Sequence, residues 1–297
     1  MKNLRKRFPV LVSIGLALLF LAVNYLLSKP LERIADTVAQ HLYLFQLIME
    51  LVVFAIFLGL AVLMGMQFIF RRSRKPLGER ILPCAAILVL YTLALLGGIT
   101  LCLEDPLQPP LKILSFVLCM LSVGLTEELI FRGLIARMLY AKYGRNPVGV
   151  WLSVLLSSLL FGLIHLSNAI GGAVELNGVL IQVVGASALG ICLSAIYLRT
   201  GSFWTVVLLH AYMDFCGLVS SGVFVSDSLA DLLGGYSSGS LIAAAVYAAL
   251  GIFLLRRSKM KTITDLSAEP PQGQIIGLMI TVLLLVGVAS AVAVITF

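Results

Sequence analysis

Apolar runs of about twenty residues, the length that a helix needs to cross a bilayer, recur along the whole chain. Short polar or charged segments separate them, and proline or glycine often stands at the joins. The pattern predicts membrane spans at residues 8–28, 43–70, 81–103, 111–140, 148–168, 177–198, 202–221, 239–255 and 274–296. We therefore expect an all-α, polytopic bundle of about nine membrane-spanning helices.

The basic residues between these spans alternate from one loop to the next. Of the 21 lysine and arginine residues, Lys29, Arg33 and Lys112 fall in one set of loops, and Arg132 falls within a span. All the others occupy the alternate loops. Loops rich in Lys and Arg stay in the cytoplasm, so we expect a multi-pass cell-membrane protein with a cytoplasmic N-terminus and an extracytoplasmic C-terminus. No small-residue cleavage site follows the first apolar run, which we interpret as a retained helix.

Composition narrows the class further. Hydrophobic residues make up 60% of the 297 residues and charged residues 12%, a balance that excludes an ordinary soluble domain. The net charge of +7 follows from the asymmetry of the loops, and we expect no nucleic-acid partner. The five cysteines lie within predicted spans and form no CxxC pair, so we interpret them as packing residues.

The fourth span carries adjacent glutamates and an arginine, in the segment TEELIFRG at residues 126–133. A charged side chain at the bilayer centre costs about 3 kcal/mol, and such residues usually mark function. Glu128 and Arg132 are four positions apart, so they share a helix face and can neutralise each other. Glu127 is rotated by about 100° from Glu128 and needs a partner from elsewhere in the chain.

Two further spans carry polar side chains at helical spacing. Phe161 and His165 are four apart in the fifth span, and His210 and Asp214 are four apart in the seventh. Glu50 is the one comparable residue in another span. If the charged groups of the fourth and seventh spans all faced lipid, the cost would be on the order of 10 kcal/mol. We therefore expect them to face one another or a polar intramembrane cavity.

Depth along the helices supports this grouping only loosely. At 1.5 Å per residue from the cytoplasmic ends of the spans, Glu127 lies about 20 Å deep, His165 about 25 Å and His210 about 12 Å. Helix tilt or displaced helix ends would have to absorb that spread.

This polar set contains what water-driven amide hydrolysis requires. A carboxylate can take a proton from water, an imidazole can donate or relay one, and further polar groups can hold the carbonyl. The same two histidines and two carboxylates would serve equally as ligands of a divalent metal, such as zinc, that activates water. A lone Glu–Arg pair is as often structural as functional, and a single buried histidine is usually a hydrogen-bonded packing residue. The prediction therefore rests on the combination of these residues.

Three motifs carry a family resemblance: Glu-Glu-x-x-x-Arg at 127–132, Phe-x-x-x-His at 161–165 and His-x-x-x-Asp at 210–214. Their order, spacing and placement on successive spans resemble the CPBP family, the CAAX-processing and bacteriocin-processing (Abi) intramembrane endopeptidases. The resemblance covers roughly residues 80 to 255. We therefore expect N-terminal helices over 1–80, a CPBP-like catalytic core over 81–255, and a cytoplasmic linker with a C-terminal helix over 256–297.

Carried to this chain, the resemblance implies a role for each motif residue. Glu127 would activate water with His165 as its partner. Glu128 with Arg132 would brace the helix, and Phe161 would line the cavity.

The third motif departs from the eukaryotic CAAX-processing enzymes. His210 and the residue at 214 would steady the oxyanion, but that residue is typically asparagine in those enzymes and is Asp214 here. An ionised aspartate cannot donate to an oxyanion, so Asp214 could instead orient His210 or bind a metal. A metal site would then be formed by Glu127, His165, His210 and Asp214.

The resemblance implies an endopeptidase that cleaves a membrane-embedded or lipid-anchored substrate, of the prenylated CAAX or bacteriocin type. Two alternatives stay open. A proton-coupled transporter also uses intramembrane carboxylates and histidines, but it predicts broken helices or repeats. A non-catalytic scaffold or immunity protein would keep the polar set for folding alone.

Overall fold

The computed structural model describes residues 1–169, 175–226, 232, 235–264 and 266. These residues form helices and turns without a named strand, as the apolar pattern predicts. The elements before the polar motifs are α1 (Lys2–Arg7), α2 (Pro9–Leu31), η1 (Glu32–Ile34), α3 (Ala35–Gln40), α4 (Leu42–Leu63), η2 (Gln67–Phe70), α5 (Leu77–Ile81), η3 (Leu82–Cys84) and α6 (Ala85–Leu101). The others are α7 (Pro110–Glu128), η4 (Leu129–Ala136), α8 (Arg137–Tyr143), α9 (Pro147–Leu163), η5 (Ile164–Ala169), α10 (Leu176–Thr200), α11 (Phe203–Gly217), α12 (Val219–Gly222), α14 (Ser240–Leu254) and α15 (Arg257–Met260).

Six helices within the described residues are long and apolar enough to cross a membrane. They are Pro9–Gln40, Leu42–Leu63, Leu77–Leu101, Pro110–Tyr143, Pro147–Ala169 and Leu176–Thr200. The predicted count of about nine is not confirmed. The seventh and eighth spans correspond to α11 and α14, which have 15 residues each. The ninth, at 274–296, lies outside the described residues.

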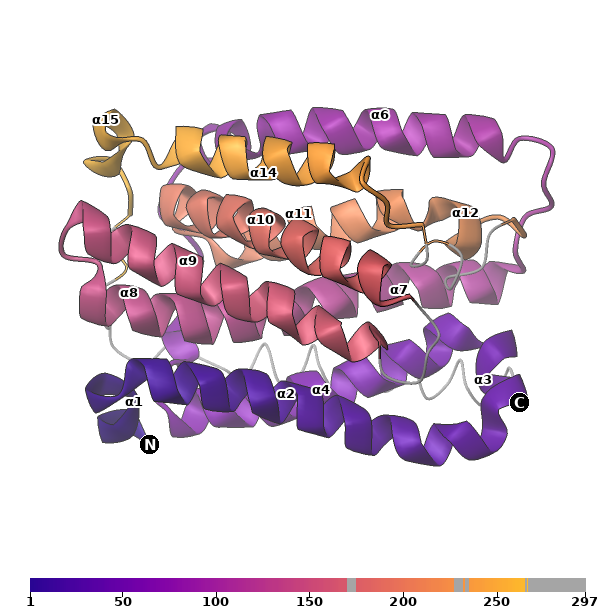
Figure 1. The fold of residues 1–297 in the computed structure, drawn as a ribbon, viewed down its shortest axis with the longest axis horizontal. Coiled ribbons are helices and arrows are strands. Elements are labelled where there is room, and N and C mark those ends of the chain that lie inside the picture. Colours follow the sequence, from indigo (N-terminus) through magenta and orange to yellow (C-terminus); the bar gives the residue numbers. More distant parts are fainter. Residues whose placement is uncertain (170–174, 227–231, 233–234, 265, 267–297) are drawn as a thin grey trace.

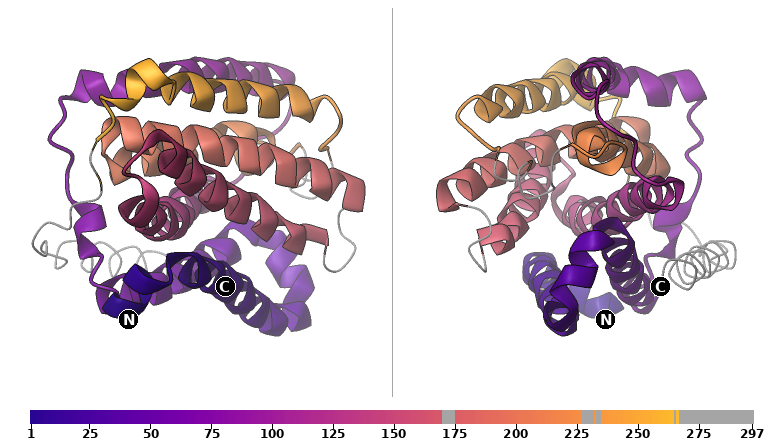
Figure 2. Two further views of the ribbon diagram at one scale, coloured as in Figure 1. Left: turned by 60° about the vertical axis from the view of Figure 1, so that its left-hand side comes forward. Right: turned by 90° about the vertical axis from the view of Figure 1, so that its right-hand side faces the viewer.

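The helices run side by side in layers (Figure 1). α7 packs between α4 and α11, α10 packs between α9 and α14, and α6 packs against α11. In Figure 1, α6 and α14 form one outer layer and α1 to α4 form the opposite one. Figure 2 shows the same layers after rotation, with several helices seen end-on. The motif helices α7, α9 and α11 therefore lie between these two outer layers, with one face of α9 exposed.

Local sequence signals explain where several helices begin and end. The Asn146 side chain accepts a hydrogen bond from the Gly149 amide at the start of α9, and Pro147 occupies the first turn. Ser202 caps α11 in the same way. Gly201 ends α10 with a φ of 60°, a left-handed conformation that glycine adopts without strain.

The basic loops meet at one end of the bundle. Lys75 Nζ donates to the Arg199 carbonyl (2.5 Å), an Arg199 guanidinium nitrogen donates to the Lys259 carbonyl (3.0 Å), and Arg5 Nε donates to the Met64 carbonyl (2.8 Å). This end is on the left of Figure 1. The grouping is what the alternation of charge predicts, while the side of the membrane on which this end lies remains a prediction.

The polar segment after α14 differs from the solvated loop that its composition suggests. The Thr264 amide donates to the Leu198 carbonyl (2.8 Å), and Leu266 is 5% exposed. The described part of this linker therefore folds back onto the end of α10, because its few apolar side chains gain burial there.

Candidate functional site

The two glutamates of the first motif stand at the end of α7, where the helix widens into the π-helix η4. Such a segment makes i→i+5 hydrogen bonds and is frequent at functional sites. Arg132 Nη1 donates to Glu128 Oε1 at 2.8 Å, so the expected ion pair is present. The Glu128 side chain is 0% exposed, whereas that of Glu127 is 14% exposed. The adjacent carboxylates therefore have different surroundings.

His210 on α11 lies among three carboxylates. Its Nδ1 is 2.8 Å from Glu128 Oε1, and its Nε2 is 3.6 Å from Glu127 Oε2 and 3.7 Å from Asp214 Oδ2. Because an ionised carboxylate only accepts, the short contact assigns the Nδ1 proton to the bond with Glu128. Nε2 is left facing the other two carboxylates, so the first and third motifs form one polar cluster.

A glycine lets these helices approach closely enough for that cluster to form. A Cβ on Gly124 would lie 2.9 Å from the Ala211 amide nitrogen and 3.0 Å from the Val207 carbonyl oxygen. Such distances force backbone to shift, so a larger side chain at this position of α7 would push α11 away. Gly124 stands one helical turn before Glu128, and His210 is adjacent to Ala211.

This contact also resolves the uneven depths expected from counting along the spans. The continuous helix Pro110–Tyr143 has 34 residues, or about 51 Å at 1.5 Å per residue. It exceeds the bilayer core of about 30 Å, so the helix tilts or one of its ends extends beyond the core. Depths counted from helix ends therefore did not match, although Glu128 and His210 are in contact.

The second motif joins the cluster mainly through an aromatic ring. Phe161 makes edge contacts with His165 (5.4 Å between centroids) and His210 (5.9 Å), and the Arg132 guanidinium lies 4.3 Å above it. His165 Nδ1 is 3.0 Å from the Phe161 carbonyl oxygen, which only accepts, so Nδ1 is assigned the proton. Within the described residues no hydrogen bond or ion pair joins His165 to Glu127. The imidazole found next to Glu127 is that of His210.

A cavity of about 540 Å³ brings the motifs to one surface. Five of the predicted site residues line it: Glu127, Phe161, His165, His210 and Asp214. Glu128 and Arg132 are not among its lining residues and lie behind it. The cavity extends from the middle of the bundle toward the end opposite the basic loops, where Asn168 and Ser240 also line it.

The sequence did not predict the other polar residues that line the cavity: Gln46, Tyr91, Asn168, Gln182, Tyr236, Ser240 and Tyr247. Tyr91 and Tyr247 share a hydrogen bond (2.6 Å), and the Asn168 amide donates to the Gln182 side chain (2.9 Å). The sequence signal that could have identified them is the presence of amide and tyrosine side chains inside or beside apolar spans. Single residues of these types are common, so only their shared cavity distinguishes them.

Tyr236 precedes α14 and contributes a donor to this cavity. Burial, followed by the negative charge of Asp214, raises the pKa of its phenol. The group therefore stays neutral at physiological pH and keeps a proton that it can donate.

The metal set predicted from the sequence was tested against the side-chain arrangement. Across the described part of the chain, no group of three or more His, Cys, Asp or Glu side chains is arranged to hold a metal ion. His210 Nδ1 is bound to Glu128 and His165 Nδ1 to a main-chain carbonyl, which leaves Nε2 of both rings available, as in metal-ligating histidines. The metal set therefore stays a prediction, and the proposed reaction uses protein groups and water.

Comparison with known proteins agrees with the motifs. Residues 109–216 match the family model described as Type II CAAX prenyl endopeptidase Rce1-like. The matched segment runs from the start of α7 almost to the end of α11 and contains all three motifs. No curated protein and no solved structure matches the chain. This match confirms the resemblance drawn from the motifs, over the segment 109–216 that is similar to the Rce1-like, type II CAAX prenyl endopeptidase family.

Proposed function

We propose that this protein is an intramembrane endopeptidase that hydrolyses a peptide bond of a membrane-associated substrate by means of activated water. The proposal rests on the different surroundings of two adjacent carboxylates. Glu128 is fully buried and bound to Arg132 and His210, whereas Glu127 faces the cavity beside an imidazole. A carboxylate with access to water and a neighbouring proton carrier is what general base catalysis needs.

The proposed reaction assigns a proton path to these groups. Glu127 accepts a proton from a cavity water while the water oxygen attacks the carbonyl carbon of the peptide. The His210 imidazole is protonated among its three carboxylates, and its Nε2–H donates to the oxyanion of the tetrahedral intermediate. The C–N bond then breaks, and the proton held by Glu127 passes to the leaving amine. This transfer regenerates the Glu127 carboxylate and completes the two products, a carboxylic acid and an amine.

The remaining motif residues hold this arrangement. Asp214, 3.7 Å from His210 Nε2, favours the imidazolium and is not itself the oxyanion donor. His165 donates from Nδ1 to the Phe161 carbonyl, so its Nε2 is an acceptor that can orient the attacking water. Phe161 packs between the two imidazoles and the Arg132 guanidinium, which limits their movement.

The substrate class follows from the surroundings of the cavity. Its walls are transmembrane helices, so a peptide reaches it within or beside the bilayer. The family description points to a prenylated C-terminus, and bacteriocin-type peptides are the other candidate class. Tyr91, Gln182 and Tyr236 supply hydrogen-bonding groups for a peptide backbone in the same cavity.

Comparing peptide termini in membranes that contain wild type or Glu127→Gln at equal levels tests the proposal. The substitution keeps side-chain size and removes the ionisable carboxylate. We expect a cleaved terminus only with wild type, and a loss of about 100- to 10,000-fold in its rate of formation. Glu104→Gln, a carboxylate in an exposed loop, is the matched control and should cleave normally. A folded Glu127→Gln protein with full activity would end the hydrolase proposal and favour a scaffold.

A further inference from the structure

Glu50 is a buried carboxyl group that the mechanism above does not use. It lies in α4, outside the segment that matches the family model. The residue is 7% exposed, and its Oε2 atom is buried without a hydrogen-bond partner in the described residues. An unpaired buried carboxylate is costly to keep, so its presence in an apolar helix requires an explanation.

The main chain of α4 ties Glu50 to the segment that holds the proposed base. The Thr126 hydroxyl donates to the Glu50 carbonyl at 3.2 Å and also interacts with the Glu50 carboxyl. Thr126 directly precedes Glu127. Gln46, one helical turn before Glu50 and on the same face of α4, lines the cavity. Glu50 therefore lies beside the catalytic cluster, behind the cavity wall.

The charged surroundings of Glu50 are negative. The titratable groups that act on it or are acted on by it are Cys119 and Glu127 on α7 and Asp214 on α11. No basic side chain of the described residues is among them. The cluster already holds three carboxylates against two cations, the Arg132 guanidinium and the imidazolium assigned above. A fourth negative charge would be buried without compensation.

We propose that Glu50 is a positioning residue held as the neutral carboxylic acid, and that through Thr126 it fixes the segment of α7 that carries Glu127. A buried carboxylate whose Oε2 atom has no partner among the described residues costs more free energy than the neutral acid, so the group retains its proton. Glu50 is not among the residues that line the cavity, whereas Glu127 is. This inference rests on the proposed function for its catalytic consequence, but not for the proton itself.

Infrared spectroscopy of the purified full-length protein tests the proton directly. A protonated carboxylic acid has a carbonyl stretching band that an ionised carboxylate lacks. Part of this band should disappear in Glu50→Gln at neutral pH, while Glu104→Gln should retain all of it. Identical band intensity in wild type and Glu50→Gln, in proteins with equal thermal unfolding temperatures, would mean that Glu50 is ionised and would overturn the inference.

Kinetics test the positioning role. Glu50→Ala removes the acid and should lower kcat by about tenfold or more with little change in KM, since misplacement of a catalytic group acts on the chemical step. Glu50→Gln keeps the shape and the neutral state, so it should lower kcat less. It should also abolish the fall in activity that ionisation of Glu50 causes at alkaline pH in wild type.

Two outcomes would remove this role. If Glu50→Ala folds and shows the wild-type kcat and pH profile, Glu50 is a packing residue only. If wild type cleaves neither prenylated nor bacteriocin-type peptides, the proposed function and the positioning role are both wrong. The infrared band then still decides whether Glu50 holds a proton, so the two failures are distinguishable.

Discussion

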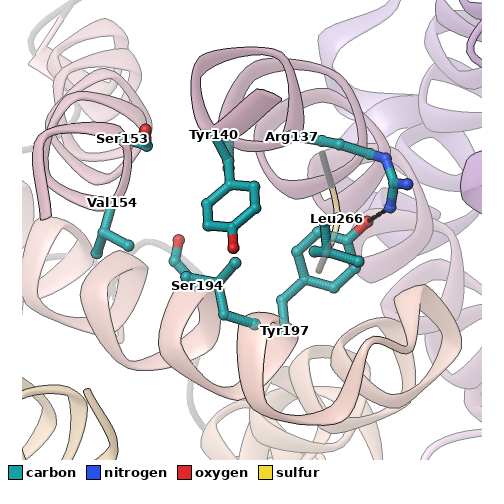
Figure 3. Close-up of a pocket in the computed structure, with 9 residues that line it drawn as sticks. Arg137, Tyr140, Ser153, Val154, Ser194, Tyr197 and Leu266 are labelled. Carbon is teal, nitrogen blue, oxygen red and sulfur yellow. Dashed lines mark hydrogen bonds between the residues drawn. The ribbon is translucent and has the colours of Figure 1, made fainter. Parts of the chain in front are cut away.

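Two buried arginines five positions apart, Arg132 and Arg137, have different surroundings. Both guanidinium groups lie over aromatic rings, at 4.3 Å from Phe161 and 4.6 Å from Phe68. Arg132 is bound to the carboxylate of Glu128 behind the large cavity. Arg137 donates to the phenol oxygen of Tyr197 at 3.3 Å, as Figure 3 shows.

The cavities beside the two arginines also differ in volume and in the residues that line them. The cavity near Arg137 has about 10 Å³ and is lined in part by Leu266 of the C-terminal linker. That volume holds one water molecule at most, and Tyr140 and Ser194 are drawn beside it in Figure 3. The cavity in front of Arg132 has about 540 Å³ and carries carboxylates and imidazoles. A buried cation alone therefore does not indicate a site. Solvent access and convergent acid–base groups do.

The largest expected difference is between the cavity and the basic end of the bundle, which we expect on opposite sides of the membrane. Labelling of one end and not the other should show it as an all-or-none result. The five native cysteines are buried, so single cysteines introduced at Asn168, which lines the cavity, and at Lys142, at the basic end, can be labelled selectively. In intact cells, a membrane-impermeant thiol reagent should label Asn168→Cys and not Lys142→Cys, because basic loops face the cytoplasm. Inverted membranes should reverse the result.

The opposite labelling pattern would place the cavity mouth in the cytoplasm. A prenylated cytoplasmic substrate would then fit the family description, whereas the orientation expected here favours a peptide presented from the extracytoplasmic side.

Arg132→Met should cause the larger loss of stability. It leaves the buried Glu128 carboxylate with His210 as its one remaining bonded partner among the described residues, and removing one partner of a buried ion pair costs about 3–5 kcal/mol. Thermal or denaturant unfolding in detergent measures the loss. The double variant Arg132→Met with Glu128→Gln should recover part of it, since the buried charge is removed. No recovery would show that the ion pair is not what couples these residues.

Arg137→Met should have the smaller effect. It removes a hydrogen bond to a neutral phenol and a ring contact, which together are worth about 1–2 kcal/mol. Cleavage of any substrate should be unchanged at a temperature where the variant is folded. A loss of activity as large as that of Glu127→Gln would mean that the basic end takes part in the reaction.

Contacts within one helix followed from local spacing. The Glu128–Arg132 ion pair, the Phe161–His165 contact and the approach of His210 to Asp214 all join residues four positions apart. Helix geometry alone brings such residues together. Several span boundaries follow from apolar length for the same reason. The predicted 148–168 corresponds to the helix Pro147–Ala169, and 177–198 corresponds to Leu176–Thr200.

Long-range packing decided the rest of the site. The contact between His210 and Glu128 joins residues 82 positions apart, and it depends on the close approach of α7 and α11 at Gly124. Glu50 and Tyr247 come from helices far from the motifs in the chain. Periodicity does not report how neighbouring helices pack, so it could not say which imidazole stands beside Glu127.

The sequence by itself determined the helical class, most of the long spans, the alternation of basic loops and the residues able to carry acid–base chemistry. These properties depend on the length of apolar runs and on spacing within one helix, both of which are local. Only the tertiary structure decided that Glu128 is bound while Glu127 is open to a cavity, because burial of adjacent residues depends on what packs against each face of the helix.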